Sequence, residues 1–321
     1  MTLSAGVIGV GSMGRNHARV YGELAGVRLA GVADADQAAA AAVAADHDTT
    51  AYGTTELLDR VDIVSIAVPT AAHADLVSAC LDANVHVLVE KPFVTDLAVG
   101  RDLAERARDD GLVLQVGHVE RFNPAVRTLT DIAPSLDIIA VDAQRLGPPV
   151  DRDDRTNVVH DLMIHDLDIV RSLVGGTPVD VNAATTADGD YATARCTFGD
   201  GTLASFTASR VTQQKVRSLA VTARDCQVVV DYLDQSVEIH RSATPAYVAE
   251  DGDIRHTMES VVERPVVESG EPLKAELDAF ADAVRTGGDP VVTPEDGLFA
   301  VDLSRRILDA ADATAVAEVS R

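Results

Sequence analysis

From Leu3 to Gly117, short apolar runs alternate with stretches that have a helical pattern. This alternation is typical of a parallel, doubly wound sheet. The predicted strands are Ala5–Gly9, Val27–Ala33, Asp62–Ala67, Val85–Val89 and Leu112–Val116. The predicted helices are Met13–Leu24, Ala35–Ala45, Thr54–Leu58, Ala72–Ala83 and Asp96–Asp110. In such a sheet the ligand is expected beyond the carboxyl ends of the strands.

After Pro124 the pattern changes. The predicted elements are a helix at Ala125–Ile132, a strand at Leu136–Arg145, a Gly-Pro-Pro loop at 147–149, an exposed polar stretch at Asp151–Arg155 and a helix at Asn157–Val174. The last helix carries an apolar stripe of Val158, Leu162, Ile169 and Leu173.

Several β-like segments then follow one another without helices between them. They are Val179–Ala184, Ala192–Phe198, Thr202–Ser209, Ser218–Thr222, Gln227–Tyr232 and Ser236–His240. Gly199-Asp200-Gly201 is a strong hairpin signal, so the second sheet is predicted to be largely antiparallel. Residues 245–270 give only a strand near Val261, and two helices, Leu273–Arg285 and Pro294–Ala317, follow.

These patterns predict an α/β fold with two domains. An N-terminal Rossmann domain, residues 1–120, would hold the doubly wound parallel sheet. A C-terminal α+β domain, residues 121–321, would hold a largely antiparallel open sheet, with the last helix able to pack back on the first domain. The chain has 321 residues, of which 46% are hydrophobic and 3% aromatic, so the core must consist of Ala, Val, Leu and Ile.

The charge predicts unusual surroundings. The formal net charge is −24, and the acidic residues are spread along the chain. Their repulsion destabilises a compact state in dilute salt, whereas molar salt shortens the Debye length to ~3 Å. We hypothesise a halophilic protein from a salt-rich cytoplasm. The same charge argues against nucleic acid as a partner.

The sequence also bears on the location of the protein and on the state of its cysteines. No apolar run approaches the ~20 residues that span a bilayer, and no signal peptide is visible, which favours a cytoplasmic protein without a membrane partner. Cys80, Cys196 and Cys226 form no C-x-x-C pair, so buried free thiols are expected.

The first predicted strand runs into a G-x-G-x-x-G pattern that precedes a helix. Gly9 would permit a tight turn, Gly11 would let the backbone approach a pyrophosphate, and Gly14 would let the helix pack closely on the strand. Ser12 and Met13 lie between the last two glycines, at a helix N-terminus that favours phosphate. A plain structural turn is the alternative interpretation.

An acidic residue supports the dinucleotide interpretation. Asp34 ends the second apolar run, ~20 residues after the glycines, where an acid binds the ribose 2′-hydroxyl and repels a 2′-phosphate. The sequence therefore favours NAD over NADP. Asp36 is better placed to start the next helix.

The other predicted strand ends carry residues that could contribute to a site. They are Val68-Pro69 with His73, then Glu90-Lys91-Pro92, and then His118 to Pro124. Lys91 is one of only three lysines, and lysine, unlike arginine, changes its protonation state readily on burial. An exposed lysine at the rim is the alternative.

One pair in the later part of the chain could move a proton. Asp161 and His165 lie four residues apart in a predicted helix, so the carboxylate could orient an imidazole suited to proton transfer near neutral pH. Two alternatives remain open: a solvated helix face with local ion pairs, and a zinc site that uses His160 and His165.

These motifs resemble those of the glucose–fructose oxidoreductase / inositol dehydrogenase / MocA (Gfo/Idh/MocA) family. The matching pieces are G-V-G-S-M-G at 9–14, A-V-P-T-A-A-H at 67–73, E-K-P at 90–92, D-L-M-I-H at 161–165 and T-P-E-D-G-L at 293–298. Residues 116–125 and 161–168 resemble the branch that includes UDP-N-acetylglucosamine 3-dehydrogenases. The resemblance implies a homo-oligomer with contacts through the open sheet.

The resemblance also implies roles for individual residues. Lys91 would contact the substrate hydroxyl, and His165 would be the acid/base with Asp161 as its partner. The residues near NAD would be Gly9, Gly11, Ser12, Met13, Gly14, Asp34, Val68, Pro69, His73, Glu90 and Lys91. The residues near the substrate would be His118, Arg121, Asn157 and His165. No metal is implied.

The implied activity is NAD-dependent oxidation of a secondary hydroxyl of a sugar or sugar nucleotide, with C3 of UDP-N-acetylglucosamine as the leading substrate position. An inositol or simple-sugar dehydrogenase is the alternative, and a non-catalytic NAD-binding sensor is the rival of another class. Cations for a substrate diphosphate, or equally for local ion pairs, are Arg121, Arg145, Arg152 and Arg155.

Overall fold

The computed structural model describes residues 2–149, 156–242, 246–250, 253–257 and 260–319. Its contacts divide the chain into two compact units. Unit 1 comprises Met1–Phe122 and Glu271–Asp302, and unit 2 comprises Asn123–Gly270 and Leu303–Arg321. The units are defined by contacts alone, and the division into domains at residue 120 stays a prediction.

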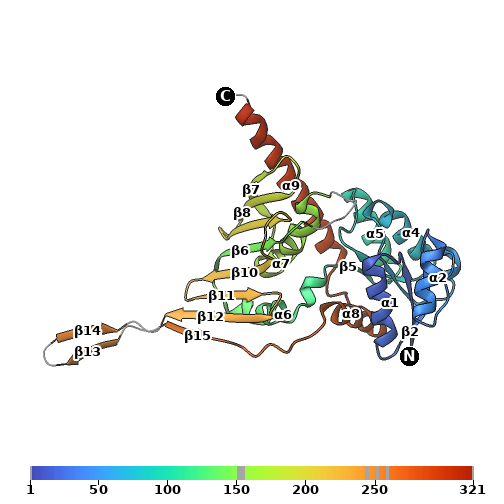
Figure 1. Cartoon of the computed structure of the whole chain (residues 1–321), viewed down its shortest axis with the longest axis horizontal. Coiled ribbons are helices and arrows are strands. Elements are labelled where there is room, and N and C mark those ends of the chain that lie inside the picture. Colours follow the sequence, from blue (N-terminus) through green and yellow to red (C-terminus); the bar gives the residue numbers. More distant parts are fainter. Residues whose placement is uncertain (1, 150–155, 243–245, 251–252, 258–259, 320–321) are drawn as a thin grey trace. The chain divides into compact units, whose positions relative to one another are not determined.

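Unit 1 is built on a five-stranded parallel sheet with strand order β2-β1-β3-β4-β5. The two edge strands, β2 and β5, are labelled in Figure 1. The strands are β1 (Leu3–Ile8), β2 (Val27–Ala33), β3 (Ile63–Ile66), β4 (His86–Glu90) and β5 (Leu114–Gly117). This confirms the predicted doubly wound sheet. The order reverses at β1, and a crevice for a ligand lies outside the carboxyl ends of the strands at such a switch point.

The helices of unit 1 are α1 (Ser12–Glu23), α2 (Gln37–Asp46), α3 (Thr54–Leu58), α4 (His73–Asp82), α5 (Leu97–Asp109), α8 (Pro272–Thr286) and the start of α9 (Pro294–Val319). Asp36 caps α2 by accepting from the N–H groups of Ala38 and Ala39, as predicted for a helix start. α8 packs on α1, so a segment from near the end of the chain completes this unit.

Apolar side chains cover both faces of the parallel sheet, as near-continuous apolar strands require. Tyr21, Leu88 and Phe280 belong to the cluster on the α1 and α8 side. Ile66 and Phe93 belong to the other cluster. All five are fully buried, so the strand ends that carry the candidate site rest on a closely packed base.

Unit 2 is built on an eight-stranded sheet with order β15-β12-β11-β10-β6-β9-β8-β7. The strands are β6 (Ile138–Leu146), β7 (Pro178–Thr185), β8 (Tyr191–Phe198), β9 (Leu203–Ser209), β10 (Val216–Ala223), β11 (Cys226–Asp231), β12 (Ser236–Ser242) and β15 (Ser260–Glu263). Only the β6–β9 pair is parallel among these described strands, which confirms a largely antiparallel sheet.

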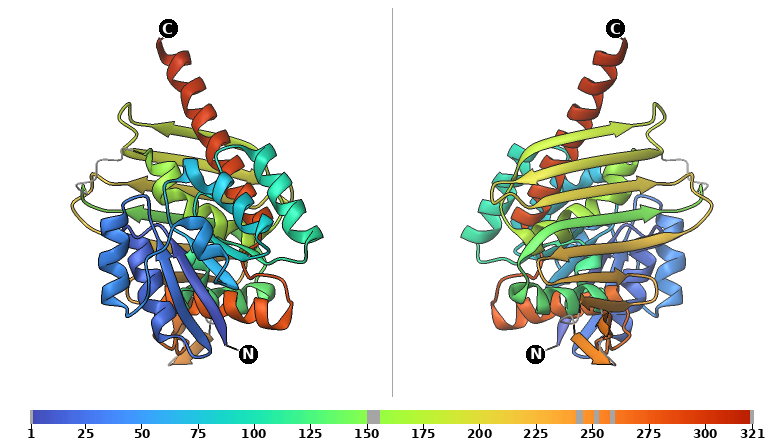
Figure 2. Two further views of the ribbon diagram at one scale, coloured as in Figure 1. Left: turned by 90° about the vertical axis from the view of Figure 1, so that its right-hand side faces the viewer. Right: turned by 90° about the vertical axis from the view of Figure 1, so that its left-hand side faces the viewer.

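One face of this sheet is covered by helices of unit 2. α6 (Pro124–Ile132) contacts β11 and β12, and α7 (Ile164–Val174) contacts β6. In Figure 2, right, no described helix crosses the face toward the viewer. The strands accordingly alternate between buried and more exposed residues, as in β8.

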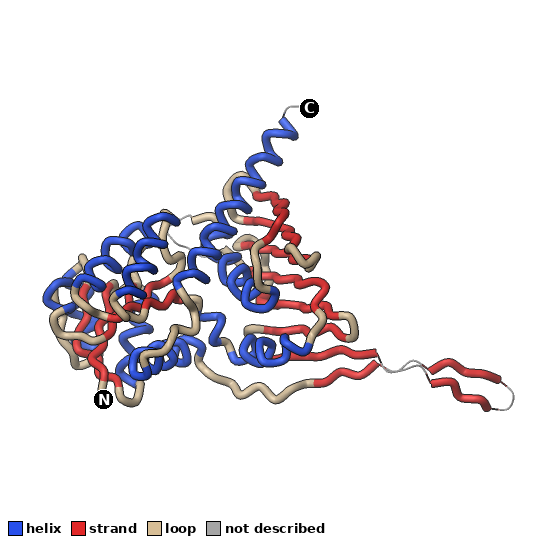
Figure 3. The backbone as a smooth tube through the Cα atoms, turned by 180° about the vertical axis from the view of Figure 1, so that it is seen from behind, coloured by secondary structure: helices blue, strands red, loops and turns tan. Residues whose placement is uncertain are grey.

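Two features of unit 2 differ from the sequence prediction. The predicted helix at Asn157–Val174 begins as a π-helix, Val159–Met163, and continues as α7. The stretch before Ser260 holds a further strand pair, β13 (Ala246–Glu250) and β14 (Asp253–Thr257), which the sequence analysis left unassigned. An irregular segment, residues 264–271, follows β15 and is the long tan stretch in Figure 3. The predicted loop at 151–155, with Arg152 and Arg155, lies outside the described residues.

None of the described helices combines the length and the hydropathy needed to cross a bilayer.

Candidate active site

The glycine-rich loop of unit 1 joins β1 to α1, and its three glycines meet three different demands. Gly9 has φ +91°, and a Cβ there would lie 2.4 Å from the carbonyl oxygen of Ala67. A Cβ on Gly14 would lie 1.7 Å from the carbonyl oxygen of Gly9. Gly11, by contrast, has no heavy atom within 4 Å of its Cβ position, so its backbone is open to a bulky anion.

The start of α1 suits a pyrophosphate. Gly11 is the N-cap and supplies no side-chain acceptor, and no acidic residue lies in the first turn. The N–H groups of the first turn, where Ser12 and Met13 lie, therefore meet no side-chain cap, and the helix dipole favours a negative charge there.

Asp34 follows β2 beside the same loop. Its Oδ2 accepts from the N–H of Val10 at 2.7 Å, and its Oδ1 accepts from the N–H of Asp36 at 2.8 Å. These bonds fix the carboxylate, and each oxygen retains a lone pair for a hydroxyl. Together with the open Gly11 backbone, this arrangement fits the pyrophosphate and ribose of NAD.

Glu90 ends β4 and is buried against α1. The Nε2 of His17 lies 3.1 Å from Glu90 Oε1, and the backbone N–H of Lys91 donates to Oε2 at 3.3 Å. Burial alone would raise the pKa of Glu90, but the hydrogen bond and charge of His17, with the charge and N–H of Lys91, lower it below its ordinary value. The ionised carboxylate therefore anchors the backbone that carries the Lys91 side chain.

His73 joins two of the strand ends. Its Nε2 lies 2.9 Å from the carbonyl oxygen of Val68, and its Nδ1 lies 2.9 Å from that of Pro92. The ring is fully buried, so its contacts are to the protein backbone on both sides. It therefore holds the Val68-Pro69 segment to the loop after Glu90, and a direct contact with the cofactor stays a prediction.

The residues predicted to bind substrate occupy different surroundings. His118 is buried at the end of β5, with 1% exposure. Arg121 lies 3.5 Å from Asp296 as an ion pair within unit 1. For Arg145 the sequence left open a diphosphate contact or a local ion pair, and the structure shows the ion pair: Arg145 is buried in a bidentate pair with Asp166, at 2.8 and 3.0 Å, inside unit 2.

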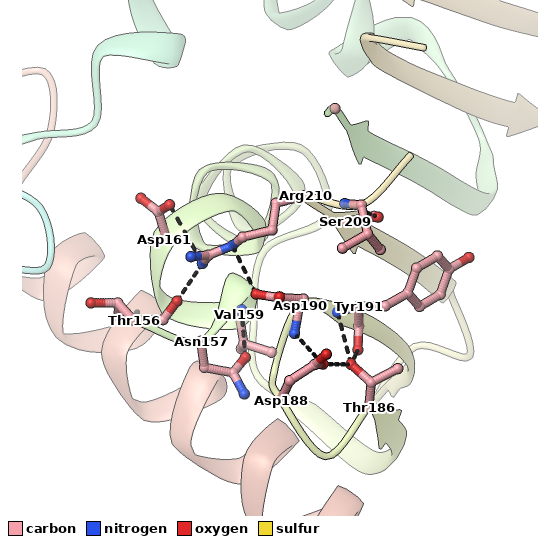
Figure 4. Close-up of polar contacts among 12 residues, drawn as sticks. Thr156, Asn157, Val159, Asp161, Thr186, Asp188, Asp190, Tyr191, Ser209 and Arg210 are labelled. Atoms are coloured by element: carbon pink, nitrogen blue, oxygen red, sulfur yellow. Dashed lines mark hydrogen bonds and ion pairs between the residues drawn. The ribbon is translucent and has the colours of Figure 1, made fainter. Parts of the chain in front are cut away.

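Asp161 lies in the π-helix, and its carboxylate faces Arg210 (Figure 4). The distance from Asp161 Oδ2 to Arg210 Nη2 is 3.7 Å. Asn157 caps this segment, since its Oδ1 accepts from the N–H of Val159 at 2.9 Å. His165 follows in the first turn of α7 and is half-buried. His165 and Lys91 belong to different units, so their convergence stays a prediction.

His17 and Arg210 were not identified from the sequence. His17 had a weak signal, because it lies three residues after Gly14 and so on the same helix face toward the sheet. Arg210 directly follows β9 and belongs to no motif. Among the described residues, no group of three or more His, Cys, Asp or Glu side chains could hold a metal ion.

Comparison with known families covers most of the chain. Residues 3–118 match an oxidoreductase family with an NAD-binding Rossmann fold, GFO_IDH_MocA. Residues 140–240 match the GFO/IDH/MocA C-terminal domain.

Individual relatives share both sequence and fold. The chain is 39% identical over 250 residues to a UDP-N-acetylglucosamine 3-dehydrogenase of Acidithiobacillus ferrooxidans, covering 75% of this chain and 78% of the relative. Superposition on a solved structure of the enzyme of that name from the same organism gives a TM-score of 0.89 at 32% identity, over 98% of both chains. An inositol 2-dehydrogenase of Rhizobium meliloti is 29% identical over 95% of both chains.

Proposed function

The chain belongs to the Gfo/Idh/MocA family of NAD-binding oxidoreductases, and we propose that it oxidises the C3 hydroxyl of UDP-N-acetylglucosamine to a ketone with NAD. The observation that carries the substrate assignment is the 39% identity to an enzyme named for this reaction. The residues at the strand ends of unit 1 support the cofactor assignment.

In this proposal, the backbone of Gly11 to Gly14 binds the pyrophosphate and Asp34 binds the ribose. A carboxylate at Asp34 repels a 2′-phosphate, so NAD is preferred to NADP. Val68, Pro69, His73 and Glu90 shape the same edge of the sheet. NAD, when bound, supplies the hydride acceptor.

The chain itself has to manage the proton and the developing charge. Lys91 is assigned to the substrate oxygen, where its ammonium stabilises negative charge in the transition state. His165 is assigned to accept the hydroxyl proton, and Asp161 to stabilise the resulting imidazolium. His118, Arg121 and Asn157 are assigned to the substrate.

The assembly and surroundings are proposed on separate grounds. The face of the eight-stranded sheet that no described helix covers supports a homo-oligomer that pairs through that face. The net charge of −24 supports a halophilic protein in a salt-rich cytoplasm.

One observation favours a second function. The inositol 2-dehydrogenase of Rhizobium meliloti aligns over 95% of this chain, a larger share than the 39%-identical relative covers. An inositol or simple-sugar dehydrogenase is therefore the runner-up.

The test is NADH formation in concentrated KCl with a panel of UDP-sugars, free sugars and inositols. The proposal expects turnover with UDP-N-acetylglucosamine, and a drop in kcat of ~100-fold or more in Lys91→Ala and His165→Ala with NAD binding retained. Turnover with inositols alone would select the runner-up. NAD binding without turnover on any compound would favour a sensor.

A further inference from the structure

Arg210 contacts groups from two separate segments of unit 2, residues 156–161 and the loop between β7 and β8 (Figure 4). Its Nη2 donates to the carbonyl oxygen of Thr156 and lies 3.7 Å from Asp161 Oδ2. Its Nε lies 3.5 Å from Asp190 Oδ1. The Arg210 side chain is only 15% exposed, so these contacts are shielded from most of the solvent.

Hydrogen bonds join the loop between β7 and β8 to the segment before the π-helix and to the backbone of Arg210. The carbonyl oxygen of Gly189 accepts from the N–H of Val158 at 3.0 Å, and the carbonyl oxygen of Asp190 accepts from the backbone N–H of Arg210 at 3.0 Å. Within the loop, Asp188 Oδ1 accepts from the Thr186 hydroxyl at 2.6 Å. The loop therefore presents the Asp190 carboxylate at a fixed place.

We propose that Arg210 is a positioning residue that fixes the start of the π-helix and thereby the place of Asp161 relative to His165. One guanidinium lies beside two partly buried carboxylates, Asp161 and Asp190, and its positive charge attracts both of them. The fork of the guanidinium also matches its several acceptors, which an ammonium could satisfy only in part. The inference rests on the proposed function, because that function gives Asp161 and His165 their roles.

The position of Arg210 beside a π-helix supports a functional role for its contacts. π-helical turns are rare and occur frequently at functional sites. Here the π-helix holds Asp161 and leads directly into His165, and it contacts β9, the strand that Arg210 follows. Arg210 thus joins the end of a rigid strand to the segment assigned to proton transfer.

The test compares Arg210→Ala and Arg210→Lys with Arg217→Ala. Arg217 is a matched control, because it also donates to backbone carbonyl groups of this sheet, those of Leu146 and Val216. Arg210→Ala should lower kcat by ~10–100-fold, as expected from a misplaced catalytic group, with the KM for NAD unchanged. Arg210→Lys should recover part of the lost kcat, and Arg217→Ala should retain full kcat.

A readout without turnover separates this proposal from the proposed function. Amide hydrogen exchange across 158–165 should speed up in Arg210→Ala, and less in Arg210→Lys, whatever the substrate proves to be. If Arg210→Ala does not fold, kcat and amide hydrogen exchange are both measured on Arg210→Lys alone. Unchanged exchange and kcat in the variants would overturn the proposal, whereas inactive wild type with faster exchange in the variants would overturn only the proposed function.

Discussion

At the scale of single residues, Glu90 shows how hydrogen bonds and neighbouring charges together outweigh the effect of burial on a pKa. A buried carboxyl ordinarily has a raised pKa, yet His17 and Lys91 lower that of Glu90. The ionised form of Glu90 therefore stabilises the fold above ~pH 4.3, the value of an unfolded Glu, and this contribution is lost as pH falls through the folded-state pKa.

His17→Ala should consequently destabilise the protein by about 3 kcal/mol near neutral pH, because it leaves a buried carboxylate without its partner. Urea unfolding at several pH values measures this. The loss should shrink as acid protonates Glu90. His47→Ala, at a half-exposed position at the end of α2, is the control and should change stability by less than ~0.5 kcal/mol. A loss that is independent of pH would contradict the assigned pairing of His17 with the Glu90 carboxylate.

Asp34→Ala should weaken NAD binding and reduce discrimination against NADP, because the mutation removes the negative charge beside the ribose. The ratio of Kd values for the two cofactors measures the effect. Asp36→Ala is a matched control, since Asp36 caps α2 and should affect stability but not cofactor choice. A ratio that moves equally in both variants would refute the ribose contact.

The residues that sequence could identify are those whose role depends on spacing. Gly9, Gly11 and Gly14 were predicted because a turn, an open backbone and a close approach each need glycine at a fixed interval. Arg145 was left open between two roles, and Arg210 was missed, for one shared reason. Whether an arginine faces solvent or a carboxylate depends on which strands become neighbours in the sheet. The local pattern of apolar and polar positions does not indicate which strands these are.

At the scale of elements, β2 and α3 have the bounds that the pattern predicts. Both elements could be delimited because their apolar residues recur regularly and the residues at each end indicate where the element stops. The π-helix could not be predicted, because its apolar stripe is compatible with an ordinary α-helix. β13 and β14 were left unassigned because each spans only five residues and neither shows a clear alternation of apolar and polar positions.

The β7–β8 loop gives a prediction at this scale. Gly189 has φ +70°, and a Cβ there would lie 2.8 Å from Asn157 Nδ2. Gly189→Ala should therefore displace the start of the π-helix without removing any charge, and lower kcat by ~10-fold. Gly201→Ala controls for the positive φ alone, since Gly201 has φ +91° and open space around it. Equal kcat values for the two variants would show that the loop does not position the helix.

At the scale of the whole molecule, the sequence indicated both sheets, because strand-helix alternation and strand succession are properties of long stretches. The sequence analysis had the last helix able to pack back on the first domain, but it gave no place to α8, because the sequence of α8 does not indicate which element it packs on.

The net charge gives a prediction for the entire chain. The midpoint of thermal unfolding should rise substantially between ~0.1 M and ~2 M KCl, because salt screens repulsion among the acidic residues. Calorimetry in both salts measures it. Full stability in dilute salt would contradict the assignment to a salt-rich cytoplasm.

The most direct test of the central claim uses UDP-N-acetylglucosamine that carries deuterium at C3. If the chain oxidises this carbon with NAD, mass spectrometry will find the deuterium in the reduced nicotinamide product. Reduced cofactor without deuterium, or none at all in concentrated KCl, would contradict the account.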